Sequence, residues 1–239
     1  MTEGICKNCK TEITQNYCPN CGIPKSLKRI DGKYIANEIG GVLNFDKGIL
    51  CTIKELIIRP GNTVKEFILN DRSKIVRPII FIIICSLIYS VLEQFLNFEK
   101  GYIYYDESIK STSMSIFGWV KENYGYGNLM MGVFIAFWTK VLFKKYSYNY
   151  YEILILLCFV MGIGMLILAI FGTIEWITKL KILQFGGMLF VVYSTWATGQ
   201  FFDKKKFSSY LKAFVSYFLG MITFIIGVFV VGKIIDLII

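Results

Sequence analysis

Four of the seven cysteines lie in the first 21 residues, as two pairs in which two residues separate the partners. The pairs are Cys6 with Cys9 and Cys18 with Cys21. Each C-x2-C pair can form a tight turn that directs two sulfurs at one point, and two facing turns complete the tetrahedral thiolate shell that Zn²⁺ prefers. We therefore predict that residues 1–27 form a zinc ribbon with these four cysteines as ligands.

Other uses of four thiols are a redox dithiol, a rubredoxin-like iron site and a pair of disulfides. Redox pairs normally sit on a thioredoxin-like strand and helix, and this context is missing around the cysteines. Such close clustering is typical of a metal site and not of a disulfide framework. Because thiolates would fill all four positions and the chain contains no histidine, we predict a structural and not a catalytic zinc. The spacing alone leaves iron open.

The composition indicates that the rest of the chain lies in a membrane. Of its 239 residues, 55% are hydrophobic and 18% are charged, which is too apolar for a soluble domain. A transmembrane helix needs about 20 apolar residues, and five runs qualify. These runs are 78–96, 126–143, 153–174, 182–202 and 211–231. We predict an all-α polytopic membrane protein with five transmembrane helices, whose bundle covers residues 77–239.

The basic residues favour a cytoplasmic N-terminus. Met1 is followed by a polar, cysteine-rich stretch, which is not the pattern of a signal peptide. With the N-terminus inside, most of the 26 Lys and Arg fall on the cytoplasmic side, as the positive-inside rule requires. The short inner loops carry Lys140, Lys144 and Lys145, and then the lysines at 204–206. We expect an external C-terminus, and we interpret the net charge of +9 as a topology signal and an attraction to anionic lipid, not as nucleic-acid binding.

A basic segment at residues 28–76 shows apolar residues at helical spacing. Its clearest stripe follows a candidate N-cap at Asp46 and consists of Ile49, Leu50, Ile53, Leu56 and Ile57. A weaker stripe covers 34–43, Arg59-Pro60-Gly61 ends the clear helix, and 63–69 can add a short helix. We expect this elbow to contribute amphipathic interfacial helices. The alternative is that its helices pack on each other or on the ribbon as a small cytosolic domain.

The predicted spans carry no group that indicates catalysis. The charged residues near them, such as Glu93 and Glu175, fall close to predicted ends, and the sequence lacks paired carboxylates, a phosphate-binding glycine loop and a Ser/His/Asp arrangement. Glycines in the last three spans predict close helix packing, and Cys85 and Cys158 are expected to be small packing residues. The hydroxyl residues expected to bond between helices, or to line a polar path, are Ser86, Ser90, Ser194, Thr195 and Thr198.

Several motifs resemble a known family. They are Tyr17 to Gly22 around the second cysteine pair, Thr52 to Leu56 leading into Arg59-Pro60-Gly61, and Asp71-Arg72 and Arg77-Pro78 before the first span. Together they resemble an uncharacterised family of bacterial membrane proteins that share a domain of unknown function. The likeness covers roughly the N-terminal two-fifths of the chain and lends no catalytic residue. The five-span layout alone is similar to Yip-type membrane proteins, which are linked to membrane trafficking in eukaryotes.

These features predict a non-enzymatic protein of the bacterial inner membrane. In this interpretation the ribbon and the elbow dock a cytoplasmic protein partner or the lipid surface, as a scaffold or adaptor, while the spans anchor the chain and can form a homo-oligomer. The alternative is a channel or small-molecule permease with the ribbon as a cap, because the last three spans contain many small and polar residues. An intramembrane enzyme ranks third.

Overall fold

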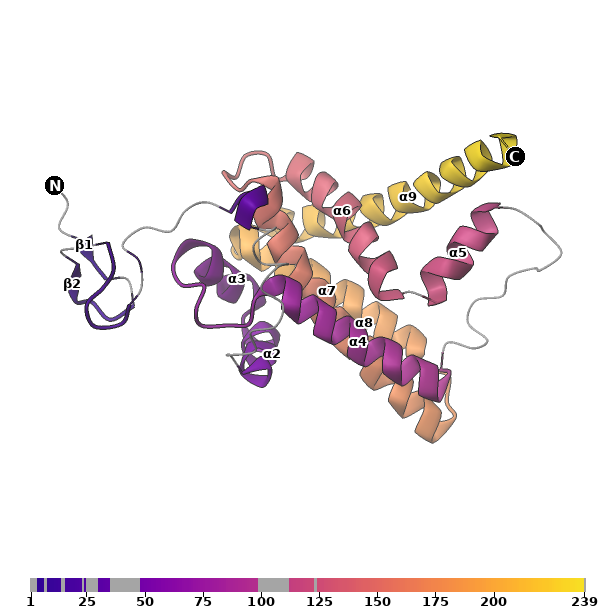
Figure 1. Ribbon diagram of the computed structural model, residues 1–239, viewed down its shortest axis with the longest axis horizontal. Coiled ribbons are helices and arrows are strands. Elements are labelled where there is room, and N and C mark those ends of the chain that lie inside the picture. The colour runs from indigo at the N-terminus through magenta and orange to yellow at the C-terminus, as the bar shows by residue number, and fades with distance from the viewer. Residues whose placement is uncertain are drawn as a thin grey trace.

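The computed structural model describes residues 4–6, 8–13, 16–22, 24, 30–34, 48–98, 112–122 and 124–238. Most of these residues are helical, and a small two-stranded hairpin lies near the N-terminus (Figure 1). Some sequence predictions fall outside the described residues. They are the weaker apolar stripe from residue 35 to residue 43 and the Asp46 cap.

The N-terminal hairpin consists of two short strands. Strands β1 (Gly4–Ile5) and β2 (Glu12–Ile13) pair in antiparallel fashion. An isolated antiparallel bridge joins Tyr17 to Pro24. Each pairing closes a loop that contains one C-x2-C pair, so the strands position the two cysteine turns.

The helices α2 to α9 follow it. They are α2 (Ile49–Ile58), α3 (Pro60–Leu69), α4 (Pro78–Leu96), α5 (Thr112–Glu122), α6 (Tyr124–Leu142), α7 (Tyr150–Thr178), α8 (Leu183–Asp203) and α9 (Phe207–Ile238). Each of the five apolar runs forms a helix, as predicted. Helix α5 was not predicted, because it lies where we expected the first outer loop. It packs on α9, where the ring of Phe117 meets the ring of Phe229 at a centroid distance of 5.3 Å.

Three helices are long and apolar enough to cross a membrane, within the described residues: Pro78–Leu96, Tyr150–Thr178 and Phe207–Leu237. These segments belong to α4, α7 and α9. The apolar part of α6, Tyr126–Leu142, is shorter, and α8 interleaves its apolar residues with glycine, serine, threonine and glutamine. The five predicted runs are therefore confirmed as helices, whereas length and composition identify three of them as candidate spans.

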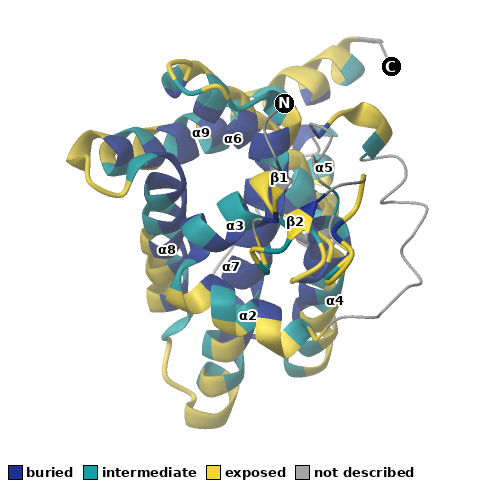
Figure 2. Cartoon of the chain, turned by 90° about the vertical axis from the view of Figure 1, so that its left-hand side faces the viewer, coloured by how far each residue is buried: buried dark blue, intermediate teal, exposed yellow. Residues whose placement is uncertain are grey.

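Helix α7 lies at the centre of the bundle. In its most apolar stretch 72% is buried inside the protein, against 28% in the corresponding stretches of α4 and α9. Helices α4, α6 and α8 pack against it, and Figure 2 shows buried residues gathered around α7 between α4 and α8. A Cβ at Gly162 would lie 2.6 Å from the ring of Phe81, so this glycine serves close helix packing as predicted. Gly187 differs, because a Cβ there would meet nothing within 4 Å.

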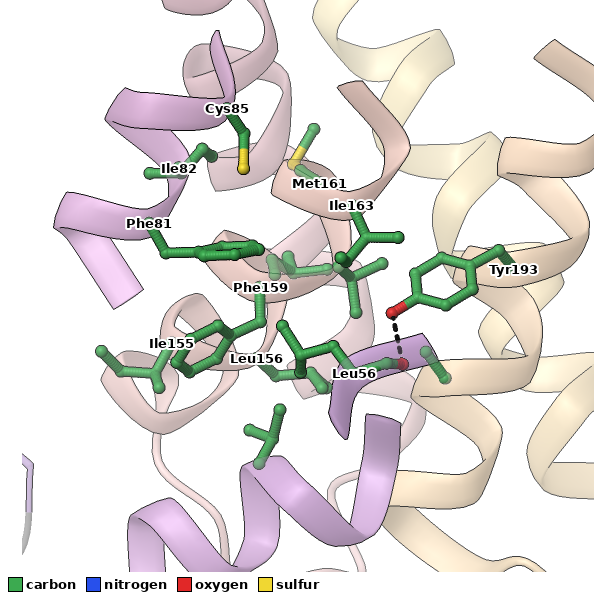
Figure 3. Close-up of a cluster of buried hydrophobic side chains, with 14 of the residues drawn as sticks. Leu56, Phe81, Ile82, Cys85, Ile155, Leu156, Phe159, Met161, Ile163 and Tyr193 are labelled. Atoms are coloured by element: carbon green, nitrogen blue, oxygen red, sulfur yellow. Dashed lines mark hydrogen bonds between the residues drawn. The ribbon is translucent and has the colours of Figure 1, made fainter. Parts of the chain in front are cut away.

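Helices α2 and α3 pack directly on the bundle. Leu56 of α2 and Phe67 of α3 are both buried, and Phe67 contacts Phe159 of α7 at a ring-centroid distance of 5.6 Å. Figure 3 shows Leu56 among side chains of α7, with Tyr193 of α8 beside it. Helix α2 takes Gly48 as its N-cap, without a side-chain cap, whereas the predicted cap, Asp46, lies outside the described residues. We expected the elbow helices to lie in the membrane interface, or to pack on each other or on the ribbon. Neither alternative included this packing on α7 and α8.

Candidate metal centre and elbow

The four N-terminal cysteines form one cluster. Their Sγ atoms all lie within 4.8 Å of one another. The Sγ atoms of Cys6 and Cys21 are 3.4 Å apart, and those of Cys9 and Cys18 are also 3.4 Å apart. A tetrahedral zinc with bonds of about 2.3 Å would separate its sulfurs by about 3.8 Å, so the cluster fits this ion with little adjustment. These cysteines could therefore hold a metal ion.

Local backbone geometry sets the two cysteine turns. The amide of Lys10 donates to the carbonyl of Cys6 at 3.0 Å, and the amide of Gly22 donates to the carbonyl of Cys18 at 2.9 Å. Both donors have positive φ, 59° for Lys10 and 71° for Gly22. Glycine adopts this conformation freely, whereas lysine adopts it at some cost. The equivalent turns therefore place the two pairs face to face.

The surroundings of the cysteines favour thiolates. Cys6 and Cys18 are 1% and 2% exposed, and both pack with Ile13. The hydroxyl of Thr11, 3.3 Å from the Sγ of Cys9, and then its backbone amide lower the pKa of Cys9 to about 5. Backbone amides, first that of Cys9, also lower the pKa of Cys6. Because metals bind the thiolate form, these hydrogen bonds prepare the site for a cation.

The other three cysteines lie apart from this cluster. Cys51 is exposed on α2, Cys85 is buried on α4, and Cys158 is half-buried on α7. The Sγ of Cys85 lies 3.5 Å from the place that a Cβ at Gly162 would occupy. Cys85 therefore fills space between α4 and α7, as predicted.

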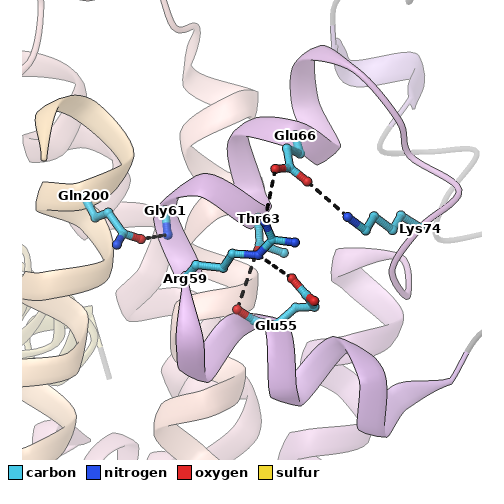
Figure 4. Close-up of polar contacts among 7 residues, drawn as sticks. All are labelled: Glu55, Arg59, Gly61, Thr63, Glu66, Lys74 and Gln200. Atoms are coloured by element: carbon cyan, nitrogen blue, oxygen red, sulfur yellow. Dashed lines mark hydrogen bonds and ion pairs between the residues drawn. The ribbon is translucent and has the colours of Figure 1, made fainter. Parts of the chain in front are cut away.

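The break between α2 and α3, inside the elbow, is held against α8. Pro60 is the first residue of α3, and the amide of Gly61 donates to Oε1 of Gln200 at 2.7 Å. A Cβ at position 61 would lie only 2.6 Å from the carbonyl carbon of Gln200 and would overlap the backbone of Phe201. Figure 4 shows Gln200 reaching across to Gly61. Proline sets the break, and glycine allows the backbones of α3 and α8 to touch.

A chain of charged side chains holds the two arms of the elbow together (Figure 4). Nε of Arg59 lies 2.7 Å from Oε2 of Glu55, and Nη1 lies 3.7 Å from Oε1 of Glu66. The other carboxylate oxygen of Glu66 lies 3.4 Å from Nζ of Lys74. Arg59 lowers the pKa of Glu55 by hydrogen bonding and by its charge. The two glutamates thus partly neutralise the positive charges of Arg59 and Lys74. The side chains of Lys54 and Arg77 are exposed.

Aromatic rings gather where α3 meets the C-terminal end of α8, beside the segment that follows α6. The rings of Phe143 and Phe202 stack with centroids 3.8 Å apart, and Tyr148 packs on Phe201 at 4.5 Å. Nζ of Lys65 donates to the carbonyl of Phe202 at 3.4 Å. Burial lowers the pKa of Lys65. The loops after α6 and α8, which carry the lysines that we predicted to lie on the cytoplasmic side, are therefore at the same end of the bundle as α3.

Residues 46–90 match the model of a family described as Protein of unknown function (DUF3667). No curated protein and no solved structure matches the chain. The matched segment includes α2, α3 and the first part of α4, and it contains the Arg59-Pro60-Gly61 break. The four clustered cysteines precede it. The resemblance to a family of unknown function is therefore supported over this segment.

The matched segment, residues 46–90, contacts residues that the sequence analysis did not connect with it. Gln200 and Tyr193 of α8 bond to the backbone of Gly61 and Leu56, across more than 130 positions of the chain. No local pattern indicates such a contact. The sequence analysis also missed the contact between the hydroxyl of Thr11 and the Sγ of Cys9. The position of Thr11, two residues after Cys9, could have indicated it.

A small cavity with a mostly apolar lining and a few hydroxyl groups lies between α6, α7, α8 and α9. Its volume is about 10 Å³, and its polar lining includes Ser194, Thr198, Ser216 and Tyr217. Oγ of Ser194 is buried and has no hydrogen-bond partner in the described part of the protein. A cavity of this size has room for about one water molecule, which the buried hydroxyl of Ser194 could bind. Two of the hydroxyl residues singled out in the sequence, Ser194 and Thr198, thus line this cavity.

Proposed function

We propose that this protein is a non-enzymatic scaffold or adaptor of the bacterial inner membrane. Its cysteine hairpin carries a structural zinc on the cytoplasmic side, and the hairpin and elbow dock a protein partner or the lipid surface. Five helices, α4 and α6 to α9, cross the membrane, with the N-terminus inside and the C-terminus outside. The observation that carries the proposal is the fixed elbow, which Gly61 and Gln200 hold against the inner part of the bundle.

The surface of α8 supports its role as a span. After Gln184, which is exposed in the first turn, its exposed residues Phe185, Met188, Leu189 and Val192 recur at helical spacing and are apolar. Its hydroxyl residues Ser194 and Thr198 are buried. A helix with this distribution presents hydrocarbon to lipid and keeps its polar groups inside, although its average composition is less apolar.

Helix α6 has the same distribution. Met130, Val133 and Phe137 are exposed, while Asn128 and Thr139 are buried. Oγ1 of Thr139 donates to Oγ of Ser216 on α9 at 3.2 Å. Lys140, near the inner end, donates to the carbonyl of Tyr148 at 2.6 Å. Apolar side chains on the exposed face, with Thr139 and Lys140 hydrogen-bonded within the protein, are what a membrane-crossing helix requires.

The four thiolates support a structural role for the metal. A metal with four protein ligands has no open position for water or substrate. A hairpin this short buries little apolar surface, so metal binding would supply most of its stability. Such a metal-stabilised unit suits protein contacts, and the surrounding lysines suit anionic lipid.

Deletion of residues 1–27 tests the docking role. We expect the truncated chain to insert normally and to lose its cytoplasmic partners in a crosslinking pull-down from native membranes. A full chain with Cys51→Ser serves as the matched control, because Cys51 lies outside the cluster. An unchanged set of crosslinked partners after the deletion would contradict the proposal.

A channel or small-molecule permease is a second candidate. The buried hydroxyl groups of Thr139, Ser194, Thr198 and Ser216 favour it, because they meet between helices of the bundle. Flux or conductance across liposomes with the reconstituted protein tests it. A solute-dependent signal that Ser194→Val abolishes would support transport, and equal traces from protein-containing and empty liposomes would count against it.

A further inference from the structure

Helix α2 crosses the bundle where α4 begins and α8 ends. Oγ1 of Thr52 accepts a hydrogen bond from the amide of Val76, just before the start of α4. Beyond the other end of α2, the amide of Gly61 donates to Gln200, which lies in the last turn of α8. Between these two points Leu56 is buried, and Figure 3 shows it among side chains of α7. In the orientation of the proposed function, α2 therefore lies along the inner boundary of the membrane.

One face of α2 is exposed and mostly apolar. Its exposed residues are Leu50, Cys51, Lys54, Ile57 and Ile58. At helical spacing they share one side of the helix, opposite the buried residues Thr52 and Leu56. Leu50 is 78% exposed and Ile58 is 61% exposed. Large aliphatic side chains grouped in this way mark a surface that contacts either another protein or lipid.

Helix α3 has a different outer face, although it packs on the same bundle. Its partly exposed residues Asn62, Lys65 and Glu66 are polar. Leu69, the last residue of α3, is the exposed apolar exception. A polar outer face is what a helix in water presents, whereas an apolar outer face suits hydrocarbon. The two arms of the elbow therefore fit different surroundings, water for α3 and the membrane for α2.

An apolar groove connects the exposed face of α2 with the outer surfaces of the spans. Ile53 and Ile57 of α2 line it, together with residues of α4 and α8 and the stretch of α7 between Ile163 and Ile174. In the proposed orientation, the lining residues of α4, α7 and α8 lie at the middle or in the outer half of the membrane. Ile170 in this wall is 57% exposed, so the groove is open to the surrounding hydrocarbon. Because Ile57 belongs both to the groove and to the exposed face, the exposed face of α2 continues a surface that contacts lipid.

Lys54 is the charged residue of this face, and its position suits a lipid surface. A lysine at the edge of the hydrocarbon keeps its methylene groups among apolar side chains and extends its amine to the headgroup phosphates. The acidic neighbour Glu55 is paired with Arg59, with 2.7 Å between Oε2 and Nε. The charge of Glu55 is therefore largely balanced, and it does not oppose a phosphate near Lys54.

We propose that the exposed face of α2 docks on the cytoplasmic leaflet of the membrane, with its aliphatic side chains among the acyl chains. The inference rests on the proposed function, in which the elbow docks a protein partner or the lipid surface, and it selects lipid for α2. The docking of a protein partner then falls to the cysteine hairpin.

Fluorescence quenching of a bimane label on the native Cys51, which is exposed, tests this contact. The full chain carries Cys85→Ser and Cys158→Ser, is purified with zinc, and is reconstituted in liposomes of phosphatidylethanolamine and phosphatidylglycerol. The same chain with Cys51→Ser measures the label that reaches the four clustered cysteines. We expect brominated acyl chains to quench the label strongly, and iodide on both sides of the membrane to quench it weakly.

Two further label positions complete the test. In the chain with Cys51→Ser, Ile58→Cys places the label elsewhere on the same face and should reproduce the result. Lys145→Cys, at an exposed lysine in the loop after α6, is the matched control. It should show the reverse, with strong quenching by iodide and weak quenching by brominated chains. Because Cys85 is buried, Cys85→Ala replaces Cys85→Ser if the latter does not fold.

Two results would overturn the inference. Strong iodide quenching at positions 51 and 58 would show that the face lies in water and is open to a protein partner. Weak quenching by both quenchers would show that protein covers the face, either a second copy of the chain or another segment of the same chain. Neither result bears on the five spans or on the hairpin, because labelling of the loops and deletion of residues 1–27 test those separately.

Discussion

The hydroxyl of Tyr193 on α8 donates a hydrogen bond of 3.0 Å to the backbone carbonyl of Leu56 on α2. In a continuous helix this carbonyl would accept from the amide four residues later, but that residue is Pro60, which has no amide hydrogen. Tyr193 therefore replaces the donor that the proline removes. Pro60 thus ends α2 and at the same time leaves a carbonyl group through which the elbow is attached to α8.

Tyr193→Phe should destabilise the protein by about 1 to 3 kcal/mol, because it leaves the carbonyl of Leu56 buried without a donor. Thermal unfolding in detergent measures the effect. Tyr210→Phe is the matched control, since the Tyr210 hydroxyl donates to the carbonyl of Lys204 at an exposed position. Equal melting temperatures for the wild type and Tyr193→Phe would contradict the importance of this bond.

Gly61→Ala should force α3 away from α8 and cost about 1 to 3 kcal/mol, because a Cβ at this position overlaps the backbone of α8. Gly187→Ala provides the comparison, as a Cβ there meets nothing within 4 Å. A helix gains up to about 1 kcal/mol from that change. Unfolding curves of the two variants should therefore move in opposite directions, and parallel shifts would argue against the close contact.

The Glu55–Arg59 pair predicts a dependence of stability on pH. Arg59 lowers the pKa of Glu55 in the folded protein, so the pair stabilises the fold fully above the ordinary pKa of glutamate, about 4.3. This contribution is lost as the pH falls below that value toward the lowered pKa. Melting temperatures between pH 7 and pH 3 measure it, and Glu55→Gln should flatten the acid side of the curve. An identical acid profile for this variant would contradict the role of the pair.

The cysteine cluster predicts one tightly bound metal per chain. Elemental analysis of purified protein should find about one zinc per chain, which Cys9→Ser should lower strongly by removing one of four ligands. Cys51→Ser should retain the metal, because Cys51 lies on α2 and outside the cluster. Iron in place of zinc would revise the identity of the ion, and full occupancy in Cys9→Ser would contradict the ligand assignment.

Sequence patterns predicted the elements well where the signal was local. The spacing of the four cysteines predicted their convergence, and the bounds of α4 agree with the first apolar run, 78–96. The break at Arg59-Pro60-Gly61 was also predicted, because proline and glycine act on their own neighbours. Helix α5 was missed, since its mixed sequence at Thr112–Glu122 is held by packing on α9.

Long-range contacts could not be predicted in this way. The attachment of the elbow depends on Gln200 and Tyr193, and neither residue carries a pattern that relates it to α2 or α3. The sequence did single out Ser194 and Thr198 of α8 as residues that bond between helices or line a polar path, but it did not show which helices would cover them. The burial of Ser194 and Thr198 appears only when α7 and α9 are placed against α8.

Cysteine labelling in intact cells tests the central claim, that five helices cross the membrane from a cytoplasmic N-terminus. Single cysteines replace Lys145, Lys181 or Lys205 in a chain whose Cys51, Cys85 and Cys158 are serine, and the chain without an added cysteine is the reference. A membrane-impermeant maleimide should label position 181 in intact cells and positions 145 and 205 only after permeabilisation. Labelling of 181 and 205 on the same side would show that α8 does not cross, and would contradict the account.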